Sequence, residues 1–323
     1  MSVLVISNAG AARARRGLPA LRAALPDSDG VLHRVTEQPE ELVSLVGHDR
    51  WRPDDLIVVN GGDGSVQHVL TALLSRCPSE RLPRLACLPG GTTNMTAYDV
   101  NAHRRFGDCA NVLRRVLAPG EQVPPAPRSV VRVRARRAGS AQLGLFFGIG
   151  TIVQGIEYFH ARVRHNGGAH ELGAGAALVR TLWGIARHQP PFSQPLEVRV
   201  RAPELMDGHG CEETPGKVSA RLLFATTLDR LFLGIRPYWG TGAGPLKTTL
   251  VERRAPGFVS RMPRLLRGRP DRVMTAARGY HSAGLHDLTL TFDGSYTLDG
   301  ELFTNPDDTL DVSASDPVKF LPL

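Results

Sequence analysis

A regular alternation of strand-like and helix-like segments over the first hundred residues limits what this chain can fold into. Short apolar runs typical of buried strands occupy Val3–Ser7, Val31–Val35, Leu56–Val59 and Leu85–Leu88. Between them apolar residues recur at helical spacing, most clearly at Val66, Val69, Leu70, Leu73 and Leu74. This alternation predicts an α/β domain whose parallel sheet is covered by helices on both faces. Ligands of such sheets bind at the carboxyl ends of the strands.

The pattern changes near residue 120, where Pro119-Gly120 and the stretch Pro124–Pro127 predict a stiff boundary. Beyond this boundary apolar and polar residues alternate as they do in β-strands, for example at 131–134, 196–201 and 288–292. We therefore predict that the second half of the chain is mainly antiparallel β structure.

Two local predictions refine this second half. Asp293-Gly294 is expected to form a hairpin turn into a strand at Ser295–Leu298, and a helix is expected near Ala174–Ala186. The expected domain limits are 1–126 for the α/β domain, to which about the last 15 residues return, and 127–308 for the β-rich domain.

The positive charge of the chain comes almost entirely from arginine. Lys+Arg exceed Asp+Glu by 8, and the lysines are Lys217, Lys247 and Lys319. The first 216 residues therefore contain neither a Schiff-base lysine nor a P-loop lysine. The four cysteines form no Cys-x-x-Cys pair, which argues against a structural zinc site. The longest apolar run, 143–156, is too short for a bilayer, and no charged segment precedes the first apolar run, so we expect a cytoplasmic protein.

Two glycine-rich loops follow neighbouring predicted strands. The first, Asn60–Ser65, contains three glycines and leads into a helix, whose free N–H groups and positive dipole end suit a phosphate group. Asp63 places a carboxylate beside that phosphate, which implies Mg²⁺ between them. The second loop, Pro89–Asn94, adds glycine and hydroxyl donors at the same edge of the sheet. Neither loop matches a Walker P-loop or a dinucleotide fingerprint, so we predict a phosphate site of another kind.

These residues resemble the diacylglycerol kinase catalytic-domain family. The resemblance rests on Gly61-Gly62-Asp63-Gly64-Ser65, on Pro89-x-Gly91-Thr92-x-Asn94-x-x-Ala97, and on Asp299-Gly300-Glu301 near the C-terminus. Leu265–Gly268 resembles the segment that precedes this last motif. The family includes bacterial lipid kinases, sphingosine kinases and ceramide kinases, and it is distantly similar to NAD kinases. The likeness covers nearly the whole chain, with the motifs in the family's order.

The resemblance implies a NAD kinase-like nucleotide-binding domain at 1–126 and a lipid-binding domain at 127–308, with a cleft between them. Its cofactors would be ATP and Mg²⁺, bound by Asn8, Gly61, Gly62, Asp63, Gly64, Ser65, Gly91, Thr92, Thr93 and Asn94. Asp63 and Glu301 would support the metal ion. Asp299 would accept the proton of a lipid hydroxyl as it attacks the γ-phosphate, with Asp63 as the second choice for this base. The expected acceptor is a diacylglycerol-like or sphingoid lipid.

Simpler interpretations of the same motifs stay open. Residues 61–65 could form an ordinary turn in which Asp63 caps a helix, and Thr92 or Thr93 could cap the next one. Asp299-Gly300 could be a hairpin turn.

Two further alternatives stay open, and the first of them rests on three departures from the family's pattern. Met95 stands where the family has an acidic residue, His68 stands where it has glutamate, and the N-terminal loop is reduced to Asn8-Ala9-Gly10. The alternatives are a non-catalytic lipid- or nucleotide-binding protein on the same scaffold, and a NAD kinase-like kinase of a soluble acceptor.

The segment Arg253–Arg278 is rich in arginine, and its apolar residues fall at helical spacing. Such a basic amphipathic segment is a candidate for peripheral contact with the inner membrane face. The alternative is a helix that packs on its own domain and exposes its arginines to solvent. Nucleic acid is not expected as a partner, because aromatic residues make up only 6% of the chain and none form a stacking platform beside the arginines. A homodimer stays open.

Overall fold

The computed structural model describes residues 1–48, 50–102, 104–118, 120, 123–136, 140–157, 196–206 and 216–323. The chain forms two compact units, each of which is described by itself. Unit 1 comprises Met1–Val130, Leu228–Gly234 and Asp316–Leu323, and unit 2 comprises Val131–Thr227 and Ile235–Ser315. The helix expected near 174–186 lies outside the described residues.

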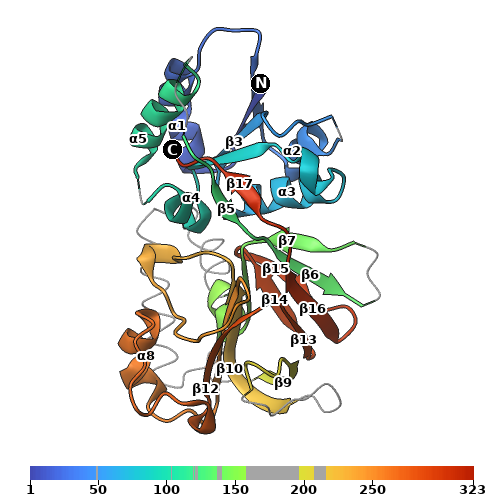
Figure 1. The fold of residues 1–323 in the computed structure, drawn as a ribbon, viewed down its shortest axis with the longest axis vertical. Coiled ribbons are helices and arrows are strands. Elements are labelled where there is room, and N and C mark those ends of the chain that lie inside the picture. Colours follow the sequence, from blue (N-terminus) through green and yellow to red (C-terminus); the bar gives the residue numbers. More distant parts are fainter. Residues whose placement is uncertain are drawn as a thin grey trace. The chain divides into compact units, whose positions relative to one another are not determined.

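Unit 1 is an α/β domain on a six-stranded sheet with the strand order β2-β1-β3-β4-β17-β5 (Figure 1). The strands are β1 (Val3–Asn8), β2 (Val31–Thr36), β3 (Leu56–Gly61), β4 (Arg84–Pro89), β5 (Ala126–Arg128) and β17 (Val318–Phe320). Strands β1 to β4 pair in parallel, as predicted, and β17 pairs in parallel with β4. The parallel sheet predicted from the alternation is therefore confirmed.

Helices cover both faces of this sheet, which explains why every residue of β3 is buried. They are α1 (Ala12–Ala24), α2 (Pro39–Val46), α3 (Asp63–Leu74), α4 (Met95–Val100) and α5 (Phe106–Val116), with 3-10 turns η1 (Ser79–Arg81) and η2 (Phe232–Gly234). On one face, α1 and α5 pack over a core that includes Leu21, Leu56, Val58 and Leu113. On the other, α2 packs against α3 (Figure 1).

Unit 2 is built on an antiparallel sheet of eleven strands, and the predicted β-rich second half is confirmed. Its path runs β15-β14-β8-β10-β9-β13-β16-β6-β7, and β11 pairs with β10 and β12. The strands are β6 (Val131–Ala135), β7 (Gln142–Gly144), β8 (Phe146–Gly150), β9 (Leu196–Arg201), β10 (Gly216–Thr226), β11 (Leu246–Glu252), β12 (Tyr280–Leu285), β13 (Asp287–Thr291), β14 (Ser295–Leu298), β15 (Glu301–Thr304) and β16 (Thr309–Ala314). Helix α8 (Phe258–Leu266) and the turn η3 (Ala276–Arg278) lie between β11 and β12, and residues 151–157 are also helical.

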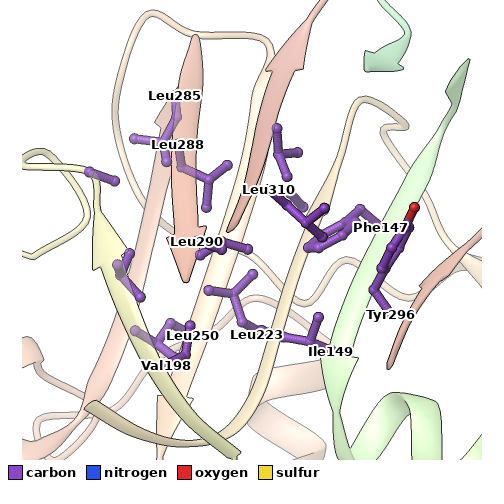
Figure 2. Packing of buried hydrophobic residues seen from close by; sticks show 14 of the residues in the cluster. Phe147, Ile149, Val198, Leu223, Leu250, Leu285, Leu288, Leu290, Tyr296 and Leu310 are labelled. Carbon is purple, nitrogen blue, oxygen red and sulfur yellow. The ribbon is translucent and has the colours of Figure 1, made fainter. Parts of the chain in front are cut away.

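The core of unit 2 gathers the inward side chains of these strands. Figure 2 shows Phe147, Leu223, Leu250, Leu290 and their neighbours pointing toward one another from different strands. All four residues are fully buried, at 0% exposed. This follows from the period of two in the strand sequences, which sends alternate residues to the core.

The hairpin predicted at Asp293-Gly294 is wrong. Strand β13 pairs with β9 and β16, whereas β14 pairs with β8 and β15, so the two strands on either side of this dipeptide are not neighbours. The backbone here is bound elsewhere: the N–H of Phe292 donates to the carbonyl of Asp308 at 2.7 Å, and the N–H of Asn305 donates to the carbonyl of Gly294 at 2.9 Å. These long-range bonds send the chain across the sheet instead of back along β13.

Candidate functional site

Three loops of unit 1 leave the carboxyl ends of adjacent strands. They follow β1, β3 and β4, whose order β1-β3-β4 in the sheet makes the loops neighbours. Side chains join them: Nδ2 of Asn8 donates to Oγ of Ser65 at 2.9 Å. In the backbone, the N–H of Gly90 donates to the carbonyl of Gly61 at 3.1 Å. The sequence prediction of one loop cluster at this edge is therefore met by direct contacts.

The Asp63 carboxylate joins the second and third of these loops. Its Oδ2 accepts hydrogen bonds from the Thr93 hydroxyl at 2.7 Å and from the Met95 N–H at 3.0 Å, and its Oδ1 accepts one from the Thr96 N–H at 3.0 Å. Asp63 is 4% exposed. Its carboxylate thus satisfies the free N–H groups at the start of α4, a capping role usually filled by a neighbour in sequence.

The glycines of these loops permit their close packing. A Cβ on Gly91 would lie 2.3 Å from Cα of Gly62, and a Cβ on Gly61 would lie 2.6 Å from Oγ of Ser65. No side chain is compatible with those separations, so the two loops touch through bare backbone. Contact between the loops explains Gly62 and Gly91, and the role of the glycines toward a nucleotide stays a prediction.

Asn94 holds the third loop in shape. It adopts a left-handed backbone conformation with φ of 51°, its Oδ1 accepts the Gly91 N–H at 2.6 Å, and its Nδ2 donates to the Gly91 carbonyl at 2.8 Å. Asparagine tolerates this conformation better than most residues. Thr92, between them, is exposed, whereas the hydroxyl of Thr93 is bound to Asp63. Of the two threonines, Thr92 is the one whose side chain is open to a ligand.

The start of α3 offers backbone donors that suit an anion, but it also carries the carboxylate of Asp63. The helix is 12 residues long and begins at Asp63, so its dipole and the N–H groups of its first turn lie beside the loop cluster. Asp63 is the acidic group in this turn. Burial raises the pKa of the nearby Cys87 thiol, and the negative charge of Asp63 raises it further. Burial is the larger cause.

The donor set fits a nucleotide phosphate more readily than a protein-held metal ion. Three of the lone-pair positions on Asp63 are already used by hydrogen bonds. Among the described residues, no group of three or more His, Cys, Asp or Glu side chains could hold a metal. Mg²⁺ in such sites is bound through one or two carboxylates, waters and substrate phosphates. Asp63 therefore fits as a single protein group beside a nucleotide-bound Mg²⁺, and its role as a ligand stays a prediction.

In unit 2, Asp299-Gly300 forms the turn between β14 and β15. Leu298 pairs with Glu301, which leaves a two-residue loop, and φ is 51° at Asp299 and 92° at Gly300. Two positive φ values in a two-residue loop are typical of a type I′ hairpin. The backbone of this motif therefore forms the hairpin turn of the simpler interpretation.

The carboxylate of Asp299 turns inward. Both of its oxygens accept the Leu145 N–H, at 3.1 and 3.0 Å, and its Oδ1 also accepts the Phe146 N–H at 2.8 Å. Asp299 is 5% exposed, whereas Glu301 is exposed. The two carboxylates that the sequence groups together therefore differ in environment: one anchors the start of β8, and the other faces solvent.

Sequence reasoning missed a second buried carboxylate in unit 1. Asp99, at the end of α4, accepts the backbone N–H groups of Asp229 and Arg230 at 3.1 and 2.8 Å and the Nε–H of Arg128 at 2.9 Å. Arg128 also pairs with Asp229 at 3.0 Å. This cluster fastens the segment Leu228–Gly234 to unit 1. No local sequence pattern predicts this cluster, because Asp99 lies about 30 residues from Arg128 and about 130 residues from Asp229.

Comparison with known proteins finds a family that is similar to most of unit 1. A family model, described as the diacylglycerol kinase catalytic domain, matches residues 2–120. Over these residues the chain is similar to that family. The match includes all of the glycine-rich loops and Asp63, and the resemblance seen in the motifs is confirmed over this range. A comparison with curated protein sequences gives no match.

The fold extends the likeness along the chain. A crystal structure of a diacylglycerol kinase from Bacillus anthracis str. Sterne aligns with 15% identity and a TM-score of 0.59. Two more structures from that organism, of a proposed diacylglycerol kinase, align with 17% and 16% identity and TM-scores of 0.63 and 0.64. Each alignment covers 100% of this chain and 97% of the other. At such identities the likeness shows a shared fold, with its α/β and antiparallel β parts.

Proposed function

We propose that this protein is an ATP-dependent phosphotransferase that transfers the γ-phosphate to the hydroxyl of a diacylglycerol-like or sphingoid lipid. The observation that carries the proposal is the loop cluster of unit 1, a region that matches the diacylglycerol kinase catalytic domain, in which Asn8 and Asp63 join the loops after three strands and Asn94 holds the third loop in shape. Phosphoryl transfer asks a protein mainly for positioning and charge neutralisation, which a rigid cluster of backbone donors provides.

The nucleotide phosphates are expected at the start of α3. Gly62 and Gly64 have no side chains that could cover the backbone N–H groups of the first turn. Thr92 adds an exposed hydroxyl from the third loop. Mg²⁺, bound with the nucleotide, would supply charge neutralisation beside Asp63. Asp63 would act chiefly by holding the third loop against α3, through its bonds to Thr93 and Thr96.

Glu301 is the better candidate for the general base. A base must be accessible to the attacking hydroxyl, and Asp299 is only 5% exposed, with three of its lone-pair positions already accepting backbone N–H groups. Glu301 is exposed and follows Asp299 by two residues, across the rigid hairpin turn. We therefore assign proton acceptance to Glu301 and positioning of that turn to Asp299.

The test is transfer of labelled γ-phosphate from Mg·ATP into diacylglycerol, ceramide and sphingosine in mixed micelles. Wild type is compared with Glu301→Gln and with Glu204→Gln, a matched change at another exposed glutamate of unit 2. We expect label in one lipid class, retained by Glu204→Gln and lost by Glu301→Gln, with ATP affinity unchanged in both. Full activity of Glu301→Gln would remove Glu301 as the base.

A second candidate is a non-catalytic nucleotide-binding protein on the same scaffold. The observation that favours it is the engagement of both Asp63 and Asp299 in backbone hydrogen bonds, together with Met95 at the position where the family has an acidic side chain. This candidate predicts that ATP binds and that no lipid receives label. NAD is included among the acceptors, because formation of NADP would instead indicate a soluble-substrate kinase.

A further inference from the structure

Residues 253–279 form a single excursion at one end of the β11–β12 pair. Val251 pairs with Tyr280, and the N–H of Glu252 donates to the carbonyl of Gly279 at 2.9 Å, so the chain leaves and re-enters the sheet at one place. The excursion contains α8 and η3 and projects from the β11–β12 end of unit 2 (Figure 1). The surface that the side chains of this excursion form therefore lies at one end of unit 2.

This excursion carries almost all of the net charge of the chain. Residues 253–279 contain eight arginines, no lysine and one acidic residue, Asp271, which gives +7 against +8 for all 323 residues. A charge of this density, concentrated in 27 residues, creates a local positive potential that attracts anionic partners.

Only two of these arginines are neutralised by carboxylates in the part of the chain that is described. Arg261 pairs with Asp271 at 3.1 Å, and Arg254 pairs with Glu252 at 2.5 Å. The other six are exposed and form no ion pair with a described residue: Arg253, Arg264, Arg267, Arg269, Arg272 and Arg278. We call these six residues the arginine surface.

The apolar face of α8 is used inside unit 2. Phe258, Met262 and Leu265 are buried, and the guanidinium of Arg221 lies 4.9 Å from the centre of the Phe258 ring. The helix therefore packs on its own domain, so its apolar face does not insert into a bilayer as an amphipathic interfacial helix would. The residues that α8 exposes are Val259, which is 41% exposed, Ser260, Pro263 and Arg264.

We propose that the arginine surface docks this protein onto a bilayer that contains anionic lipids. Unpaired guanidinium groups bind lipid phosphates and carboxylates through charge-assisted hydrogen bonds. Val259 is an exposed apolar residue of the same excursion, which a bilayer surface can accommodate. A single-stranded nucleic acid would need exposed aromatic rings, and Phe258, the one aromatic residue of the excursion, is 4% exposed.

Each arginine within reach of an anionic leaflet contributes about 1 kcal/mol, a factor of about five in the partition coefficient. Removing three of the six should therefore lower partitioning by about a hundredfold at low ionic strength. Because the contacts are exposed, binding should weaken as salt rises.

The test is sedimentation of the full chain with phosphatidylcholine vesicles that do or do not contain phosphatidylserine, in the absence of nucleotide. The variant combines Arg264→Gln, Arg267→Gln and Arg269→Gln, and it is called the α8 variant because its changes lie in this helix or just after it. The control combines Arg15→Gln, Arg34→Gln and Arg114→Gln, which removes the same charge from exposed positions of unit 1. Because neither ATP nor a lipid acceptor is present, the result does not depend on whether the protein transfers phosphate.

We expect wild type and control to bind only the anionic vesicles, and the α8 variant to lose about two orders of magnitude in partitioning. Equal losses in both variants would overturn the proposal, because they would trace binding to net charge alone. So would absence of binding to anionic vesicles by the wild type. Tighter binding of the wild type to duplex DNA than to the vesicles, abolished in the α8 variant, would reassign the surface to nucleic acid.

Discussion

Oδ1 of Asp63 accepts the backbone N–H of Thr96 at 3.0 Å, a hydrogen bond between residues 33 apart that caps one helix with the first residue of another. Through this bond the third loop of the cluster is held against α3. The same carboxylate binds the Thr93 hydroxyl and the Met95 N–H. One buried side chain thus fixes the geometry that the nucleotide phosphates would meet.

Asp63→Asn should therefore destabilise unit 1 as well as weaken nucleotide binding. Asparagine offers one acceptor oxygen, and its amide group would face N–H donors, so buried hydrogen bonds are lost at a cost of about 1–3 kcal/mol in the free energy of unfolding. Urea denaturation measures this loss, and ATP titration measures the binding. Asp54→Asn, at an exposed position of the same unit, serves as the control and should change neither.

Thr93→Val separates the two effects of Asp63. It removes one hydroxyl donor and leaves both N–H contacts of the carboxylate in place, so we expect a loss of about 1 kcal/mol in unfolding free energy. ATP affinity should fall less than in Asp63→Asn. If Thr93→Val instead abolishes ATP binding while stability is unchanged, the Thr93 hydroxyl contacts the nucleotide and its bond to Asp63 is secondary.

Loss of charge should lower the free energy of unfolding much more at Asp299 than at Glu301. Asp299→Asn keeps a residue that tolerates positive φ but loses acceptors for the Leu145 and Phe146 N–H groups, so the free energy of unfolding should fall by about 1–3 kcal/mol. Glu301→Gln is exposed and should change stability by less than about 0.5 kcal/mol. A large loss of stability in Glu301→Gln with none in Asp299→Asn would contradict the structure of this turn.

Two Asp-Gly dipeptides in unit 2 show how far local sequence patterns reach. Both predict hairpin turns, yet only Asp299-Gly300 closes one, because its flanking strands β14 and β15 pair with each other. Asp293-Gly294 lies between strands that pair with other partners. The turn propensity is the same in both places, and strand pairing across the sheet decides the outcome. Such pairing depends on contacts distant in sequence, which periodicity does not report.

The parallel sheet and the loop cluster were predictable because their signals are local in sequence. The strand β3, the glycines after it and the periodic helix α3 are contiguous in sequence, so each local signal reinforces the next. The roles of Asp63 and Asp299 as anchors of backbone N–H groups were not predictable, because the N–H groups that they bind lie about 30 and 150 residues away. The motif gives the position of a carboxylate but not its partners.

Asp99→Ala should loosen the segment Leu228–Gly234 without unfolding unit 1. The change removes the acceptor for the Asp229 and Arg230 N–H groups and one partner of Arg128. Hydrogen exchange at these two amides should accelerate by about 10- to 100-fold, the equivalent of about 1–3 kcal/mol. Asp108→Ala, a change elsewhere in unit 1, is the control. Unchanged exchange at residues 229 and 230 would show that another contact holds this segment.

Unit 2 contains a buried carboxylate, Glu252, that should make its stability depend on acid pH. Oε1 of Glu252 lies 2.8 Å from Nε2 of His281, and Nδ1 of His281 lies 3.2 Å from the carbonyl of Leu205. Burial acts to raise the pKa of Glu252, but hydrogen bonds from Arg254 and His281 outweigh it, and the pKa lies below its ordinary value.

A carboxyl group whose pKa is lowered by folding stabilises the folded state above its unfolded pKa, and this contribution is lost as the pH falls through the folded pKa. Glu252→Gln should therefore cost about 1–3 kcal/mol in unfolding free energy near neutral pH. The difference from wild type should shrink as the pH falls below the ordinary range of glutamate, because the wild type then also loses the charge. Denaturation curves at a series of pH values measure it, with the exposed Glu204→Gln as control. A difference that stays constant from neutral to acid pH would show that the Glu252 charge adds nothing to the folded state.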